Sequence, residues 1–116
     1  MDYLNYFRSK FPENSNLFNR GQVLIIILGC FGDFDSIEYA QSLYRYLGEC
    51  KRNRISLFIL GIGNSKSKEI FSNYTGIPNE YIEYTEDNNI HIELKLINPQ
   101  HYKLSPEINM LLMCCG

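Results

Sequence analysis

The most informative feature of the chain is a pair of long apolar runs. The first covers residues 23–28 and the second covers residues 55–62, where Ser56 is the one polar residue. A run of apolar residues without alternation is typical of a strand that is covered on both faces of a sheet, as strands in parallel sheets are. The sequence therefore predicts two buried strands, at 22–29 and 55–62.

The segment between these runs has the spacing of a helix. Its apolar residues recur at steps of three and four: Ile37, Ala40, Leu43, Tyr44 and Leu47. They form one apolar stripe along a helix over 36–48. Asp35 and Glu38 have the spacing of a capping box that opens this helix. A strand, a helix and a strand in this order predict a βαβ unit with parallel strands and a right-handed crossover.

Shorter elements flank this unit. We expect a polar N-terminal arm over 1–21 with one short helix. After the loop Gly63-Asn64-Ser65, which contains an N-cap candidate, we expect a second short helix that Gly76 closes. Residues 81–84 alternate as in a strand. Residues 90–97 fit either a strand or one helical face, and the polar start at 87–89 favours a helix.

The C-terminal segment is apolar on every side. Pro106 suits the first turn of a helix, because its missing N–H costs nothing there, and the apolar residues run from Ile108 to Cys115. A helix of this kind must be buried. We therefore expect that the chain is truncated and continues past residue 116, or that it associates with itself through Ile108, Leu111 and Leu112.

Composition excludes several classes of protein. The chain has 116 residues, enough for one domain with its own core, and its formal net charge of −2 argues against a nucleic-acid binder. No apolar run is long enough to span a membrane, and the N-terminus lacks the basic start and apolar core of a signal peptide. We therefore expect an intracellular protein with no membrane span.

The order of elements and three segments together resemble a known family. The segments are Gly32-Asp33-Phe34-Asp35-Ser36-Ile37-Glu38-Tyr39-Ala40, Thr75-Gly76-Ile77-Pro78 and Leu111-Leu112-Met113-Cys114-Cys115-Gly116. They are similar to a cyanobacterial and plastid branch of the alkyl hydroperoxide reductase / thiol-specific antioxidant (AhpC/TSA) superfamily. The resemblance covers the predicted domain, residues 22–116. It implies an α/β, peroxiredoxin-like form of the thioredoxin fold, incomplete here, with a β-α-β core, a further strand and a C-terminal helix. It also implies a location in the cytoplasm or the plastid stroma.

The resemblance also implies where the chemistry should be. Catalytic members carry a peroxidatic cysteine, or a Cys-x-x-Cys pair, where the first strand turns into the first helix. The helix N-terminus lowers the pKa of a thiol there, and the thiolate attacks the peroxide. In this chain the matching positions are Asp33, Phe34, Asp35 and Ser36. The loop from Gly32 to Ser36 is thus equivalent to an active site from which both cysteines are absent.

The cysteines that remain are weak candidates. Cys30 lies three residues before Asp33, but the negative charges of Asp33 and Asp35 disfavour its thiolate. Cys114 and Cys115 lie in an apolar segment, where a thiol is a poor nucleophile, and Cys50 is far from the loop. We assign no catalytic residue, and Cys30 is the one cysteine that a displaced redox centre would use.

Other motifs point to no metal or cofactor. Cysteines and the histidines His91 and His101 lack the spacing of zinc ligands, and both histidines are expected at the surface. The Gly61-Ile62-Gly63-Asn64-Ser65 segment lacks the third glycine or the lysine of a phosphate cradle, so we interpret it as a simple loop. The basic segment 51–54 is expected to be a solvated loop.

Two hypotheses of function follow. The first is a peroxiredoxin-like protein with a redox or antioxidant role inferred from the family, which lacks its peroxidatic cysteine. The second is a non-catalytic binding or assembly module on a thioredoxin scaffold. A reactive thiol would favour the first hypothesis, and inert thiols would favour the second.

Overall fold

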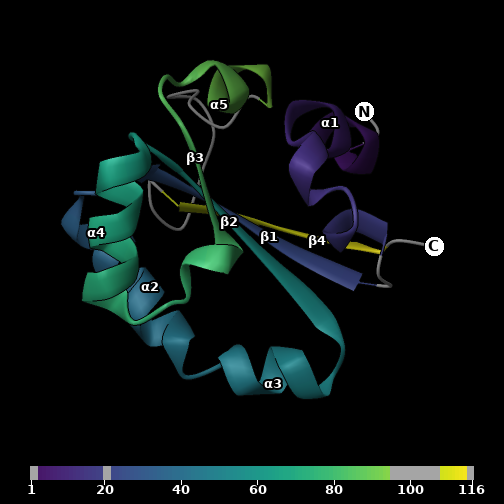
Figure 1. The fold of residues 1–116 in the computed structure, drawn as a ribbon, viewed down its shortest axis with the longest axis horizontal. Coiled ribbons are helices and arrows are strands. Elements are labelled where there is room, and N and C mark those ends of the chain that lie inside the picture. Colours follow the sequence, from purple (N-terminus) through teal and green to yellow (C-terminus); the bar gives the residue numbers. More distant parts are fainter. Residues whose placement is uncertain (1–2, 20–21, 95–107, 115–116) are drawn as a thin grey trace.

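The protein folds around a four-stranded sheet with the strand order β3-β2-β1-β4 (Figure 1). The computed structural model describes residues 3–19, 22–94 and 108–114. Strands β1 (Gln22–Cys30), β2 (Ile55–Ile62) and β3 (Ile82–Thr85) are parallel neighbours, and β4 (Ile108–Cys114) runs antiparallel to β1. The first two predicted strands, their parallel pairing and the third strand are confirmed.

The described helices are α1 (Tyr3–Lys10), α2 (Phe34–Tyr44), α3 (Leu47–Arg52), α4 (Ser65–Thr75) and α5 (Asn89–Glu93), with 3-10 turns at Pro12–Asn14, Leu17–Asn19 and Asn79–Tyr81. The expected helix over 36–48 is two helices, because the backbone tightens after Tyr44. The Tyr46 N–H donates to the Leu43 carbonyl at 2.8 Å, and α3 starts one residue later. The helix expected at 87–97 is confirmed for Asn89–Glu93.

The capping box lies on a different helix from the one that the sequence indicated. Helix α2 begins at Phe34 with Asp33 as its N-cap, so Asp35 lies inside the helix and does not open it. Because the Asp33 N–H donates to the Cys30 carbonyl at 3.1 Å, the turn is complete two residues earlier than the Asp35–Glu38 spacing suggests. Asn64 and Ser67 form the reciprocal box at the start of α4, and Gly76 ends that helix at φ 81°.

The prediction of a C-terminal helix is wrong. Residues 108–114 form β4, which pairs with β1 from Gln22↔Cys114 to Leu28↔Ile108. Asn109 is the one polar residue of this run, which leaves no periodicity that separates a strand from a helix. Pairing with the open edge of β1 satisfies its backbone groups. Self-association through Ile108, Leu111 and Leu112 concerns side chains outside the described part of the chain, and it stays a prediction for light scattering.

Alternate residues of the central strands enter two cores, one on each face of the sheet. One face packs Ile26, Leu28, Leu57 and Ile59 under α2 and α4, with Ala40 and Phe71 from those helices. The other face carries Val23, Ile25, Ile27, Phe58 and Leu60. Both strands are therefore covered on both sides, as their unbroken apolar sequence predicts.

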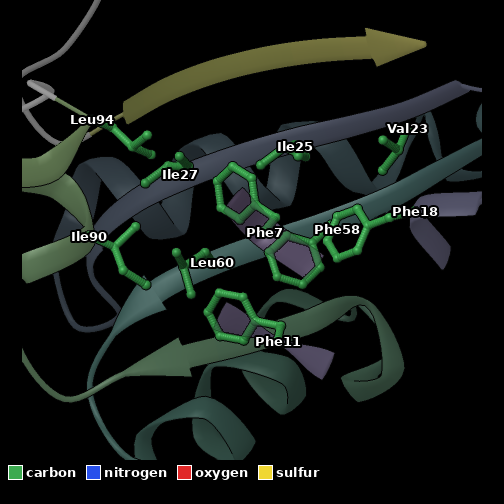
Figure 2. Packing of buried hydrophobic residues seen from close by; sticks show 10 residues of the cluster. All are labelled: Phe7, Phe11, Phe18, Val23, Ile25, Ile27, Phe58, Leu60, Ile90 and Leu94. Carbon is green, nitrogen blue, oxygen red and sulfur yellow. The ribbon is translucent and has the colours of Figure 1, made fainter. Parts of the chain in front are cut away.

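The N-terminal arm supplies the cover of the second face. Phe7, Phe11 and Phe18 surround Phe58 of β2 (Figure 2). Their ring centroids lie 6.0, 5.3 and 5.2 Å from the centroid of the Phe58 ring. The Tyr6 hydroxyl donates to Glu93 Oε2 at 2.6 Å, which links α1 to α5. Burial, and then the hydrogen bond to Glu93 and its charge, raise the pKa of Tyr6. Residues 3–18 thus belong to the same core as the sheet.

Candidate functional site

The candidate site lies where β1 ends and α2 begins, at the carboxyl end of the parallel strands. Cys30 is the last residue of β1 and is exposed, whereas the next side chain, Phe31, is 3% exposed. The chain then turns through Gly32 and Asp33 into the first turn of α2. Phe34 is 83% exposed at this turn. Cys30 therefore lies three residues before Asp33, the N-cap of α2.

The start of α2 has backbone donors but no thiol. Asp33 is in extended conformation, with φ −72° and ψ 136°, and its carbonyl accepts from the Ile37 N–H at 3.0 Å. Its carboxylate makes no capping hydrogen bond to the helix. An N-cap position of this kind is where a helix stabilises negative charge. In this chain that charge belongs to a carboxylate, which peroxide does not oxidise.

Ser36 is the second of the two positions at which the family resemblance would place cysteines, and it faces the protein interior. Its side chain is fully buried, and its Oγ has no hydrogen-bond partner among the described residues. A buried hydroxyl without a partner costs about 1–3 kcal/mol. Ser36 therefore offers no nucleophile to a solvent-borne peroxide.

The two thiols that the structure describes lie at opposite ends of β1 and β2. Cys30 pairs in register with Ile62 at the carboxyl end of β2, while Cys50 belongs to α3, which precedes the start of β2 at Ile55. Burial, and then the charge of Glu49, raise the pKa of Cys50, so this thiol stays protonated at neutral pH. The side chains of Cys114 and Cys115 lie outside the described residues. The geometry does not bring Cys30 and Cys50 together as a redox pair.

His91 is not a surface residue, which corrects our expectation. It is 2% exposed in α5, and its Nε2 donates to the Leu28 carbonyl of β1 at 2.6 Å. The register between β1 and β2 shifts between Ile27 and Cys30, and Leu28 lies within that irregular stretch. His91 therefore supports the backbone just before Cys30. In the sequence, its apolar neighbour Ile90, which is also buried, was a signal of this burial, whereas Ile92 is exposed. His101 lies outside the described residues.

The glycines of the 61–65 segment make room for the ring of Phe31. A Cβ on Gly61 would lie 2.3 Å from Phe31 Cε1, and a Cβ on Gly63 would lie 2.8 Å from Phe31 Cδ2. These glycines leave the space in which the Phe31 ring lies. The Asn64 carboxamide oxygen already accepts from the Ser67 N–H at 2.9 Å at the start of α4. Gly61 and Ile62 are the last residues of β2 and Ser65 is the first residue of α4, so the expected loop between strand and helix is confined to Gly63 and Asn64.

Within the described ranges, no group of three or more His, Cys, Asp or Glu residues is placed to hold a metal ion. No helix in the same part of the chain is both long and apolar enough to cross a membrane. Comparison with protein-family models, with curated proteins and with solved structures finds no match to this chain.

Proposed function

We propose that the chain is a peroxiredoxin-like protein of the thioredoxin fold that has lost its peroxide-reducing centre and acts as a non-catalytic binding module. The observation that carries the proposal is the first turn of α2. Asp33 is the N-cap of that helix and Ser36 is buried beneath it, at the two positions where catalytic relatives would carry thiols.

The arrangement of the sheet supports the scaffold part of the proposal. Strand β1, helix α2 and strand β2 form the βαβ unit, and the antiparallel strand β4 pairs with the other edge of β1. A mixed sheet with helices on both faces, in which the helix after the central strand starts at the site, is compatible with a thioredoxin-like architecture. The resemblance in residues 32–40 falls on this same helix start.

The chemistry of peroxide reduction supports the loss of activity. A thiolate sulfur attacks one peroxide oxygen, the O–O bond breaks, and a sulfenic acid and water are formed. The reaction needs a thiolate that donors hold at the helix terminus. Cys30 is exposed, but it precedes the helix and its neighbour Asp33 brings negative charge to that terminus. Peroxide therefore has access to Cys30, but the described residues do not supply the environment that activates a thiol.

The exposed side chains at the same turn support a binding role. Phe34 is 83% exposed at the first position of α2, four residues after the exposed Cys30. Exposed aromatic side chains are enriched where proteins bind partners. The turn therefore has an apolar contact residue where the catalytic relatives have their reactive centre.

A second candidate function, thiol redox chemistry at Cys30, is favoured by the exposure of that side chain. Alkylation of the native protein with iodoacetamide at pH 6 and pH 8 separates the two candidates, with an unstructured cysteine peptide as the reference. We expect every thiol of the native protein to react no faster than the peptide at pH 6. A native thiol that reacts much faster than the peptide at pH 6, and that is lost in Cys30→Ser, would favour the redox function.

A further inference from the structure

A cavity of about 600 Å³ lies at the opposite end of the sheet from the candidate site. It is formed where α3 turns into β2, next to the residues Ile55, Ser56 and Leu57. Because β1 and β2 are parallel and pair from Gln22↔Ile55 to Cys30↔Ile62, this end is the amino end of the strands. The cavity is therefore separate from the turn that carries Cys30 and Phe34.

The lining of the cavity is apolar inside and basic outside. Leu17, Leu47, Leu57 and Tyr81 supply the apolar walls, and Leu57 is 2% exposed. Lys51 and Arg54 also line the cavity and are exposed, so their charges stand at its rim. No carboxylate lines it, and neither cation forms an ion pair with an acidic side chain, among the residues that the structure describes. Their charges are available to an anion.

The backbone holds Arg54 in an uncommon conformation. Arg54 has φ 57°, the left-handed region that glycine or asparagine ordinarily occupies just after a helix. Its N–H donates to the Lys51 carbonyl at 3.2 Å, which closes the end of α3 and brings both cations to one turn. The turn would form at least as well with glycine. The arginine therefore supplies a charge at this place without being needed for the turn.

We propose that this cavity binds a small amphipathic anion, an organic carboxylate or phosphate with an apolar tail. The tail lies against Leu47, Leu57 and Tyr81, and the charged group lies between Lys51 and Arg54. A volume of about 600 Å³ is within the range of small-molecule sites, which are lined mainly by apolar groups with a few polar ones that fix orientation. The site is independent of the proposed function and of any thiol chemistry at Cys30.

The test is a titration of the ¹⁵N-labelled protein at pH 7 with octanoate, octyl phosphate and uncharged 1-octanol. Both anions should shift the amide signals of residues 47–57, and the tighter of the two identifies the preferred head group. Octanol should bind more weakly than either anion, by about three- to fivefold for each ion pair that it cannot form with Lys51 or Arg54. Equal affinity for octanol, or an absence of shifts in residues 47–57, would overturn the proposal.

Two variants with the same loss of charge sharpen the result. Arg54→Gly keeps the turn, since glycine adopts the φ of Arg54 without strain, and it should weaken octanoate binding about three- to fivefold. Arg52→Gln is the matched control, because Arg52 does not line the cavity and pairs with Glu49 at 3.7 Å. It should leave the affinity unchanged. Equal effects of the two variants would show a general charge effect and contradict a site at Arg54.

Cys50 gives a second readout, because it also lines the cavity. Bound octanoate should slow the labelling of Cys50 by N-ethylmaleimide. Cys30, which is exposed at the other end of the sheet, is the internal control in the same sample. Mass spectrometry of the tryptic peptides separates the two cysteines. Equal labelling rates of Cys50 with and without octanoate would contradict binding in the cavity.

Discussion

Replacing Gly61 by alanine tests the packing that positions the candidate site. Gly61 is buried in β2, and a Cβ added there would lie 2.3 Å from Cε1 and 2.7 Å from Cδ1 of Phe31. Phe31 is the residue between Cys30 and Gly32, and its ring also lies 4.9 Å from the ring of Phe71 in α4. Because the ring is enclosed on both sides, the added methyl group must displace either the ring or the strand.

The magnitude follows from two opposing effects. Forcing an extra methyl group into a packed core costs about 1–3 kcal/mol. Alanine in place of glycine inside a strand recovers about 0.5–1 kcal/mol of backbone entropy. We therefore expect Gly61→Ala to lower the free energy of unfolding by about 1–2 kcal/mol. In a Phe31→Leu background the methyl group has room, so most of this cost should disappear.

Urea unfolding followed by circular dichroism measures all four proteins of this double-mutant cycle. Gly48→Ala is the control, because nothing lies within 4 Å of a Cβ at Gly48 in helix α3. This change should raise the free energy of unfolding by up to about 1 kcal/mol, the gain of alanine over glycine in a helix. The packing argument is refuted if Gly61→Ala is as stable as the unchanged protein, or if its cost is the same in the Phe31→Leu background.

Three further predictions concern single side chains. Ser36→Ala should raise the free energy of unfolding by about 1 kcal/mol in a urea titration, because it removes a buried hydroxyl without a partner among the described residues. A lower stability would show that the hydroxyl is satisfied. The raised pKa of Tyr6 means that the folded protein holds this proton more tightly than the unfolded chain, so its contribution is complete below about pH 10 and is lost at higher pH. Tyr6→Phe should therefore lose less stability than the unchanged protein between pH 9 and pH 11, and an identical loss in both proteins would contradict the role of Tyr6. Asp33→Cys should introduce a thiol that iodoacetamide alkylates at pH 6 about tenfold faster than an unstructured cysteine peptide, because the α2 N-terminus stabilises a thiolate. The same rate as the peptide would show that this helix end does not activate thiols.

The sequence predicted those elements of the fold whose pattern of apolar residues fits only one kind of secondary structure. Residues 23–28 and 55–62 are so apolar that neither can be a strand with one face in solvent. Because a helix connects these two strands, they are expected to be parallel. The end of α2 was harder to predict, since apolar spacing continues through Leu47 although the backbone turns after Tyr44. The run 108–114 carries no periodicity, and its pairing with distant β1 decided its conformation.

The candidate site was predictable only in its position along the chain. The turn after β1 and the absence of cysteine at Asp33 and Ser36 follow from the sequence. The burial of Ser36 and the contact of His91 with Leu28 depend on how α2 and α5 pack against β1. The cavity near Arg54 joins Leu17, Cys50 and Tyr81 from separate segments, and no local pattern marks residues that meet only through the tertiary fold.

The measurement that tests the central claim most directly is the consumption of hydrogen peroxide with dithiothreitol as the reductant. The unchanged protein and Cys30→Ser are compared at equal concentration at pH 7. Because Asp33 occupies the N-cap of α2 and Ser36 is buried, we expect both proteins to consume peroxide at the rate of ordinary thiols. Turnover well above that rate, abolished by Cys30→Ser, would contradict the loss of the centre and identify Cys30 as a relocated peroxidatic cysteine.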